Sequence, residues 1–319
     1  MLKQLAQSLY RNVLDEAGIP ATMAAVLQAH PALLKADFLE KKTASSNDIH
    51  RWDGLGASAR GFDGQQGILL GWADALGSYQ SIDLPVPALK SLVTSKRIDS
   101  FSCDIADIET LSGGKSSLTD FENLDDFARQ RCADKIADVS KQGLMKNLQH
   151  DQIRILGPNP SDSLSRFAWD DRINLLNDGG AHHFAAARYI AKTTGISVPI
   201  TARLHEYALS AVAANELTGQ FDIFAIGDPS SDPRAGLAMQ DAFKSLRATF
   251  FIGSMPWSPN THTREASAVF LPKSDAKSQR VAKLFRKEGM MDLGALLEEK
   301  LEHQRSFKRS QQYATELSK

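Results

Sequence analysis

The sequence predicts an α/β or α+β fold with a mixed β-sheet core, a helical N-terminal region and a helical C-terminal tail. Near both ends of the chain, apolar residues recur at three- and four-residue spacing, which is typical of amphipathic helices. Short apolar runs bounded by glycine, proline and aspartate gather in the middle of the chain, which is typical of strands. The 319 residues, 42% of them hydrophobic and 24% charged, are enough to bury a sizeable core.

These patterns divide the chain into three regions. Residues 1–150 are expected to form a mainly helical N-terminal region, residues 151–272 a mixed α/β core, and residues 273–319 a charged helical tail. We find no internal repeat and no long linker of biased composition, so the boundaries rest on the change of pattern alone.

The first region is expected to begin with an amphipathic helix. Its apolar face is formed by Leu2, Leu5, Leu9 and Val13. A second helix is expected from Ala21 to about Lys41, kinked or split by Pro31. A further amphipathic helix is expected from Leu124 to about His150, whereas the run Gly67–Ala73 fits either a strand or a buried helical turn.

The core region begins with a predicted hairpin. The runs Arg166–Trp169 and Arg172–Leu176 flank Asp170-Asp171, and Arg154–Leu156 is a short strand candidate before them. A helix from about His182 to Thr194 should end at Gly195 and lead into a strand over 198–204. Three further strands are predicted over residues 221–226, 249–252 and 266–271.

Composition and charge exclude several classes of protein. A net charge of −1 and a pI near 6.7 give no overall attraction to nucleic acid or to an anionic membrane. Two cysteines cannot form a disulfide scaffold or a four-cysteine zinc site; one bridge is an alternative to the favoured pair of free thiols. We see neither a signal-peptide core nor a run approaching the ~20 apolar residues of a membrane helix, so a cytoplasmic location is expected.

The segment Asp178-Gly179-Gly180-Ala181-His182-His183 carries the main functional hypothesis. It joins a predicted strand to a predicted helix, and its two glycines can adopt a positive φ. The first N–H groups of a helix have no intrahelical partner and carry a partial positive charge. Such a helix start is an anion-binding site in many proteins, and both histidines stand where they would donate to the same anion.

The same segment resembles the ParB/sulfiredoxin-like superfamily over about residues 170–207. In that superfamily a strand leads into a glycine-containing turn of the type Asp-Gly-x-His-Arg, then an alanine-rich helix, then a strand with a Val-Pro or Ile-Pro start. The matching runs here are Leu175-Leu176-Asn177-Asp178-Gly179-Gly180-Ala181-His182-His183-Phe184-Ala185-Ala186-Ala187 and Ile196-Ser197-Val198-Pro199-Ile200.

The resemblance implies that the turn holds nucleotide phosphates, with Gly179, Gly180 and His182 at the family's phosphate-binding positions. Two residues depart from the family pattern. Ala181 stands where sulfiredoxins have their nucleophilic cysteine, so sulfinic-acid reductase activity is not expected. His183 stands where the family has arginine, a role that Arg188, Arg203 or Arg172 would have to fill.

The leading functional hypothesis is therefore a nucleotide- or phosphate-binding protein, with ATPase, phosphotransferase or nuclease activity as the catalytic options. ATP or another nucleotide would bind with Mg²⁺: Gly179 and Gly180 would cradle phosphate, His182 and His183 would donate to it, and Asp178 would help to hold the metal. A non-catalytic DNA-binding or protein-interaction factor with a degenerate ParB-like fold is the alternative. A third option is a strand-to-helix turn that binds no ligand.

Two other loops carry weaker motifs. Leu111–Ser117 includes Gly-Gly-Lys-Ser, like the end of a nucleotide-binding P-loop, but Glu109 replaces the required first glycine and no clear strand precedes it, so a polar loop is favoured. Gly227–Arg234 follows a predicted strand, and Asp228 or Asp232 would be magnesium ligands there, although an ordinary turn is favoured.

The remaining candidates concern nucleic acid. In the loop 255–264, Trp257 would stack on a base while His262 and Arg264 meet phosphate, although packing of Trp257 on the core is favoured. Residues 273–309 hold ten basic and six acidic side chains, which allows weak nucleic-acid contact; a solvated helix face is the favoured interpretation.

Overall fold

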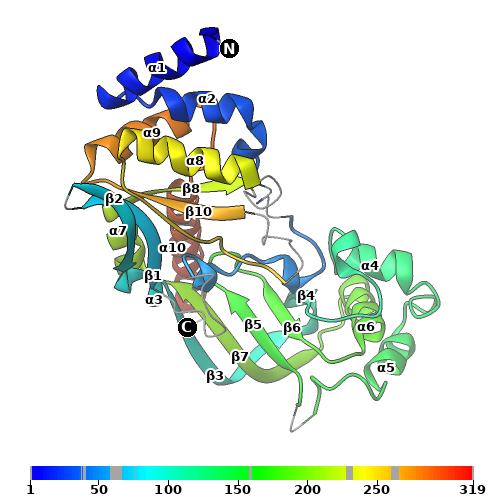
Figure 1. Cartoon of the computed structure of the whole chain (residues 1–319). Helices are drawn as coiled ribbons and strands as arrows, with labels where there is room; N and C mark the ends of the chain where they lie inside the picture. The colour runs from blue at the N-terminus through cyan, green and yellow to red at the C-terminus, as the bar shows by residue number, and fades with distance from the viewer. Residues whose placement is uncertain are drawn as a thin grey trace.

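The computed structural model of the chain describes residues 2–36, 38, 41–57, 67–75, 77–157, 160–227, 233–259 and 266–317. Within them the fold is α+β, as the sequence predicts, with helices at both ends of the chain and two five-stranded sheets between them (Figure 1). The elements form layers: helices on the outer side of each sheet, and a mixed layer of helix and loop between the sheets.

The first sheet is antiparallel throughout. Its order is β2 (Ser78–Pro85), β1 (Ile68–Ala75), β9 (Phe250–Ser254), β10 (Ala266–Pro272), β8 (Phe221–Gly227). The three strands predicted over residues 221–271 are confirmed, and the ambiguous run from Gly67 is a strand. The four strands β1 to β4 all lie within residues 1–150, so the prediction of a mainly helical N-terminal region is wrong there.

Four helices lie on the outer side of this sheet, the first of them packed on the other helices rather than on the strands (Figure 1). They are α1 (Leu2–Glu16), α2 (Ala21–Ala29), α8 (Pro233–Leu246) and α9 (Ala276–Lys287). Phe243 of α8 stacks on Phe250 of β9 at 4.0 Å between ring centroids, in the core of this layer. Helix α2 is shorter than predicted, because Pro31 begins a separate 3-10 turn that ends at Leu34.

The second sheet is mixed. Its order is β3 (Val93–Asp104), β7 (Pro199–Leu209), β5 (Ser163–Phe167), β6 (Ile173–Leu176), β4 (Ile108–Leu111). Strands β5 and β6 form the predicted hairpin, with Asp171 in its turn at φ 68°. Strands β4 and β6 are parallel neighbours, so their carboxyl ends lie at the same edge of the sheet. This edge carries the candidate site.

Three helices pack on the outer face of the second sheet: α4 (Leu124–Arg131), α5 (Lys141–Leu148) and α6 (Ala181–Thr194). Helix α6 ends before Gly195, which has a φ of 67°, as predicted. The single helix expected over residues 124–150 is instead two, because α4 stops at Cys132 and Ser140 caps the start of α5. The short strand expected at Arg154–Leu156 does not form.

The layer between the sheets contains α3 (Pro87–Lys90), α7 (Ala211–Gln220), α10 (Leu293–Leu317) and the segment around Trp52. Helix α10 connects the two sheets, because it packs against β8 while the Gln304 amide pairs with both backbone groups of Leu209 on β7, at 2.8 and 2.9 Å. None of the described helices combines the length and the apolar character that a membrane span requires.

Candidate functional site

Helix α6 begins at a glycine turn that leaves its first turn without a side-chain cap. Gly179 and Gly180 have φ values of 100° and 70°. A Cβ atom at Gly180 would lie 2.4 Å from the carbonyl oxygen of Gln152, so this position accepts only glycine. The Gly180 amide donates to the side chain of Gln152 at 3.3 Å, and the first three residues of α6 line the surface hollow described below.

A second glycine-containing loop, at residues 112–117, lies directly beside this turn. The buried side chain of Asn177 joins the two loops: its oxygen accepts from the Gly113 amide at 3.2 Å, and its nitrogen donates to the carbonyls of Gly113 and Gly179 at 2.9 and 2.7 Å. Because β4 and β6 are parallel, their following loops emerge together at one edge of the sheet. Such edges are where many α/β proteins hold their ligands.

The loop at 112–117 differs from its prediction in one respect. A strand, β4, does precede it, although none was expected. The loop is nevertheless no P-loop, because Glu109 lies within β4 and a short 3-10 turn, η5 (Leu118–Asp120), follows in place of a helix. Its importance lies in its position beside α6.

Between the two loops is a hollow of about 670 Å³. Residues 113–115 and 177–183 line it, together with Lys135, His150 and Gln152. Lys115 and Lys135 bring positive charge to its walls, and the Lys135 ammonium also pairs with Asp134 at 2.9 Å. The one carboxylate among the described lining residues, Asp178, is 96% exposed and pairs with Arg154 at 3.3 Å. The hollow thus combines an uncapped helix start with positive side chains, a combination that attracts anions.

Both predicted histidines line this hollow, and their environment lowers the pKa of each. Burial has the largest effect on the pKa of His182, followed by the charges of Lys135 and Lys115. Burial and then His150 lower the pKa of His183, whose ring stacks on that of His150 at 3.7 Å between centroids. Both rings are therefore neutral near pH 7, and a bound anion would raise the pKa of each.

The Ser116 hydroxyl lies 3.3 Å from Nε2 of His182, a contact that joins residues from the two loops. A serine beside a histidine is the beginning of a nucleophile and base arrangement. Among the described residues, however, no carboxylate is hydrogen-bonded to the other ring nitrogen of His182. The contact therefore supplies the nucleophile and the base, two of the three groups that an activated serine requires. In this structure it orients the imidazole of His182.

Three arginines proposed from the sequence lie elsewhere. Arg188 is buried and bonds to Asp125 at 2.5 Å and to the carbonyl of Ile108, so it cannot reach back to the turn. Arg203 is exposed on β7 and does not line the hollow. Arg172 is buried at the opposite end of β6, paired with Asp170. None of the three therefore lies where it could take the place of the family arginine, and the lysines that line the hollow are Lys115 and Lys135.

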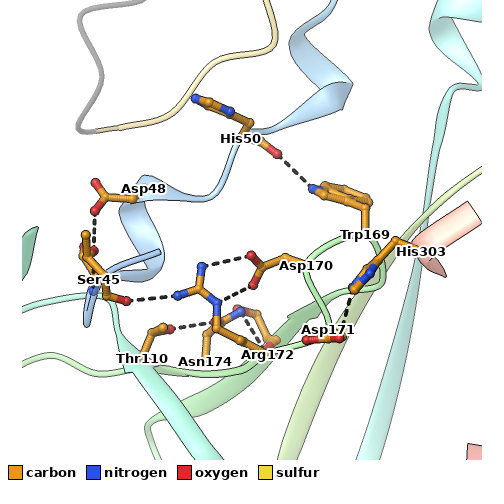
Figure 2. Close-up of polar contacts among 12 residues, drawn as sticks. Ser45, Asp48, His50, Thr110, Trp169, Asp170, Asp171, Arg172, Asn174 and His303 are labelled. Atoms are coloured by element: carbon orange, nitrogen blue, oxygen red, sulfur yellow. Dashed lines mark hydrogen bonds and ion pairs between the residues drawn. The ribbon is translucent and has the colours of Figure 1, made fainter. Parts of the chain in front are cut away.

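Arg172 belongs to a separate polar cluster inside the protein (Figure 2). It donates to both carboxylate oxygens of Asp170 at 2.7 and 2.9 Å, and to the carbonyl of Thr43 at 3.0 Å. Beside it, Thr110 donates to Asn174 at 2.6 Å across the parallel strands β4 and β6. These groups are buried and bonded to one another, so we assign this cluster to holding the segment 43–50 against the second sheet.

The described residues contain no group of three histidine, cysteine, aspartate or glutamate side chains arranged to hold a metal ion. At the hollow, Asp178 is the one carboxylate ligand available for Mg²⁺ within the described lining. Bound Mg²⁺ commonly takes one or two protein carboxylates and completes its shell with substrate phosphates and water. The lining therefore fits a magnesium ion that arrives with a phosphorylated ligand better than a resident ion.

A model described as a family of unknown function (DUF6685) matches residues 98–311. The chain belongs to this family. No curated protein and no solved structure matches it. The matched segment contains all the described residues that line the hollow.

The other sequence candidates have mixed outcomes. Asp228, Asp232, His262 and Arg264 lie outside the described residues. Trp257 is 44% exposed and belongs to no core cluster, although one side of its ring packs on Gly54 and the Arg51 guanidinium lies 5.9 Å from the ring centroid.

The basic tail is divided between α9 and α10, which lie in different layers (Figure 1). Arg286 of α9 pairs with Asp222 at 2.6 Å and Asp292 at 3.1 Å. In α10, Arg305 pairs with Glu302 at 3.2 Å. Part of the positive charge is thus neutralised by local partners, and nucleic-acid contact through residues 273–309 stays a prediction.

Sequence reasoning identified the turn, the histidines and Asp178, favoured an ordinary polar loop at Lys115, and missed Lys135 and the linking role of Asn177. The glycines at 113–114 were the available signal, since they follow a strand as Gly179 and Gly180 do. Recognising that signal required knowing that the two strands are parallel neighbours.

Proposed function

We propose that this protein binds the phosphate group of a small phosphorylated ligand in the hollow at the start of α6. One observation carries the proposal: a helix start without a side-chain cap faces a hollow whose walls include Lys115 and Lys135. Backbone amides, the helix dipole and two ammonium groups would then act on the same anion. The resemblance to the ParB/sulfiredoxin group, which led to the same turn, supports the same ligand chemistry.

In this proposal each lining group has a defined role. The amides at Ala181 to His183 donate to phosphate oxygens, while Lys115 and Lys135 neutralise its charge. His182 and His183 take up protons when the anion binds and become charged donors. Mg²⁺, where a nucleotide carries it, would be held by the nucleotide's phosphates with Asp178 at the edge.

Thermal unfolding tests the proposal. A ligand that binds only the folded state raises the melting temperature, and at 100 times its dissociation constant it adds about 2.7 kcal/mol to the stability. We expect inorganic phosphate, ATP or CTP at millimolar concentration to raise the melting temperature of the wild type. Lys115→Ala should reduce the shift, whereas Lys96→Ala, which removes an exposed lysine on β3 outside the hollow, should not.

The absence of a shift with every phosphate compound would contradict the proposal. Equal shifts in Lys115→Ala and the wild type would place the binding elsewhere on the protein.

A further inference from the structure

A second hollow, of about 550 Å³, adjoins the first on the other side of the 112–117 loop. Its lining is almost entirely polar, and Leu118 is the one apolar side chain among the described residues that form it. Hydroxyl, amide and carboxylate groups dominate; they include Ser45, Asn47, Asp48, Ser117, Thr119 and Asp120. Such a surface offers hydrogen bonds rather than apolar contact.

The two hollows share Gly113 and Gly114. Neither glycine carries a side chain, so at that point the hollows lie on either side of bare loop backbone. Ser116 lines the second hollow, and its hydroxyl contacts His182, which lines the first. A single extended ligand can therefore contact both sides of the loop.

The charges of the two hollows are opposite in balance. Among the lining side chains, the first hollow has Lys115 and Lys135, the latter paired with Asp134, against Asp178. The second has Asp48, one oxygen of which accepts from the Thr43 hydroxyl, and Asp120 against Lys41. A phosphate group is favoured by the first hollow and opposed by the carboxylates of the second. Carboxylates are strong acceptors for hydroxyl groups, so the second hollow favours an uncharged, hydroxyl-bearing group.

We infer that the ligand is a phosphorylated sugar or polyol, with its phosphate at the start of α6 and its hydroxyl groups against Asp48, Asp120 and the neighbouring hydroxyl side chains. The inference rests on the proposed function and narrows it to one class of phosphate compound. A nucleobase has no corresponding place, because the described lining of the second hollow includes no aromatic side chain on which a base would stack.

Calorimetric titration with four probes tests the inference: inorganic phosphate, ribose 5-phosphate, glucose 6-phosphate and AMP. At least one of the two sugar phosphates should bind about tenfold tighter than inorganic phosphate, the effect of one hydrogen bond to a charged group. AMP should bind no tighter than ribose 5-phosphate. Asp120→Asn, at an exposed position, should weaken binding of that sugar phosphate and leave binding of inorganic phosphate unchanged.

The outcomes separate this inference from the proposed function. If all four probes bind equally and Asp120→Asn changes nothing, the inference is overturned and phosphate binding stands. If AMP binds more tightly than ribose 5-phosphate, the ligand is a nucleotide and the inference is again overturned. If no probe binds, the proposed function fails and the inference with it.

Discussion

The two polar regions of the second sheet lie at opposite ends of β6. They differ in whether their polar groups are paired inside the protein or exposed at its surface. At one end, Arg172 and Asp170 are buried, and their charges are paired within the protein. At the other end, the first turn of α6 is uncapped and Lys115 is exposed beside a hollow. The first region is complete without a ligand, whereas the second presents donors and positive charge at the surface.

The comparison distinguishes residues that maintain the fold from residues available for binding. A buried charge that finds its partners inside the chain stabilises one arrangement of the segments around it, and its loss leaves that partner unpaired. A charge at the edge of a hollow contributes little to folding, because water already solvates it. Substitutions in the first region should therefore change stability, and those in the second should change ligand affinity.

The largest expected effect belongs to the buried region. Replacing Arg172 with Met leaves the carboxylate of Asp170 buried and unpaired, so the free energy of unfolding should fall by about 3–5 kcal/mol. Arg97→Met is a matched control, since Arg97 pairs with Asp99 on the surface and its loss should cost at most about 1 kcal/mol. Denaturant unfolding of both variants measures the difference, and equal costs would show that the buried pair does not hold the fold.

Gly195 and Gly180 have nearly equal φ values. Replacing each with alanine therefore distinguishes the cost of backbone strain from the cost of a steric clash. Gly195→Ala should cost about 1–2 kcal/mol of unfolding free energy, because alanine disfavours its φ of 67° but the space beside it is empty. Gly180→Ala should cost about 1–3 kcal/mol more, because its Cβ would also meet the Gln152 carbonyl. A smaller loss at Gly180 than at Gly195 would mean that the turn relaxes away from Gln152.

Lys115→Ala, in the wall of the hollow, should lower the affinity for phosphate and leave the stability nearly unchanged. We expect unfolding free energy to change by less than about 0.5 kcal/mol, because the side chain is exposed. The affinity for inorganic phosphate should fall about tenfold, the effect of one lost charge-assisted contact. Calorimetry and denaturant unfolding on the same samples check both expectations, and a large stability loss with unchanged affinity would remove the distinction between the two regions.

The smallest effect concerns pH. Burial lowers the pKa of His182 and His183 in the folded protein below the unfolded value near 6.5. Their contribution to stability is therefore complete above about pH 6.5 and is lost as the pH falls through their lowered pKa values, because the unfolded state then binds more protons.

Denaturant unfolding at about pH 7.5 and 5.5, on either side of the ordinary histidine pKa, measures this loss. The His182→Gln and His183→Gln double variant should lose less stability than the wild type between these two conditions. Sulfate affinity should show the opposite trend and rise on acidification, since sulfate keeps its double charge while the histidines become cations. A wild type and double variant with identical pH dependence would show that these histidines titrate normally.

The extent to which the sequence predicts this fold differs between the sheets and the site. Strands such as β8 and β10 are marked by largely apolar runs, and α6 by its glycines at both ends, so the local pattern is sufficient to predict them. The break between α4 and α5 was missed because Ser140 is an ordinary residue until its side chain caps the amides of Gln142 and Gly143. Local reasoning found the elements whose signals lie within one segment.

The rest of the site could not be predicted because it depends on contacts across the sheet. Asn177 links residues 112–113 to the turn, and Lys135 reaches the hollow from the loop between α4 and α5. Arg188 is one of three arginines that the resemblance offers as a cation for the turn, but tertiary structure places its guanidinium against Asp125. Only the order and direction of the strands show which of these residues meet.

The most direct test of the account is a phosphate titration of the ¹⁵N-labelled protein followed by amide chemical shifts. Saturable shifts should concentrate at Gly180 to His183 and at Lys115, while the amides around Arg172 and Asp170 stay unchanged. In Lys115→Ala the same amides should move, but at about tenfold higher phosphate concentration. An unchanged spectrum at millimolar phosphate, or shifts centred away from the start of α6, would contradict the claim that this hollow is the anion site.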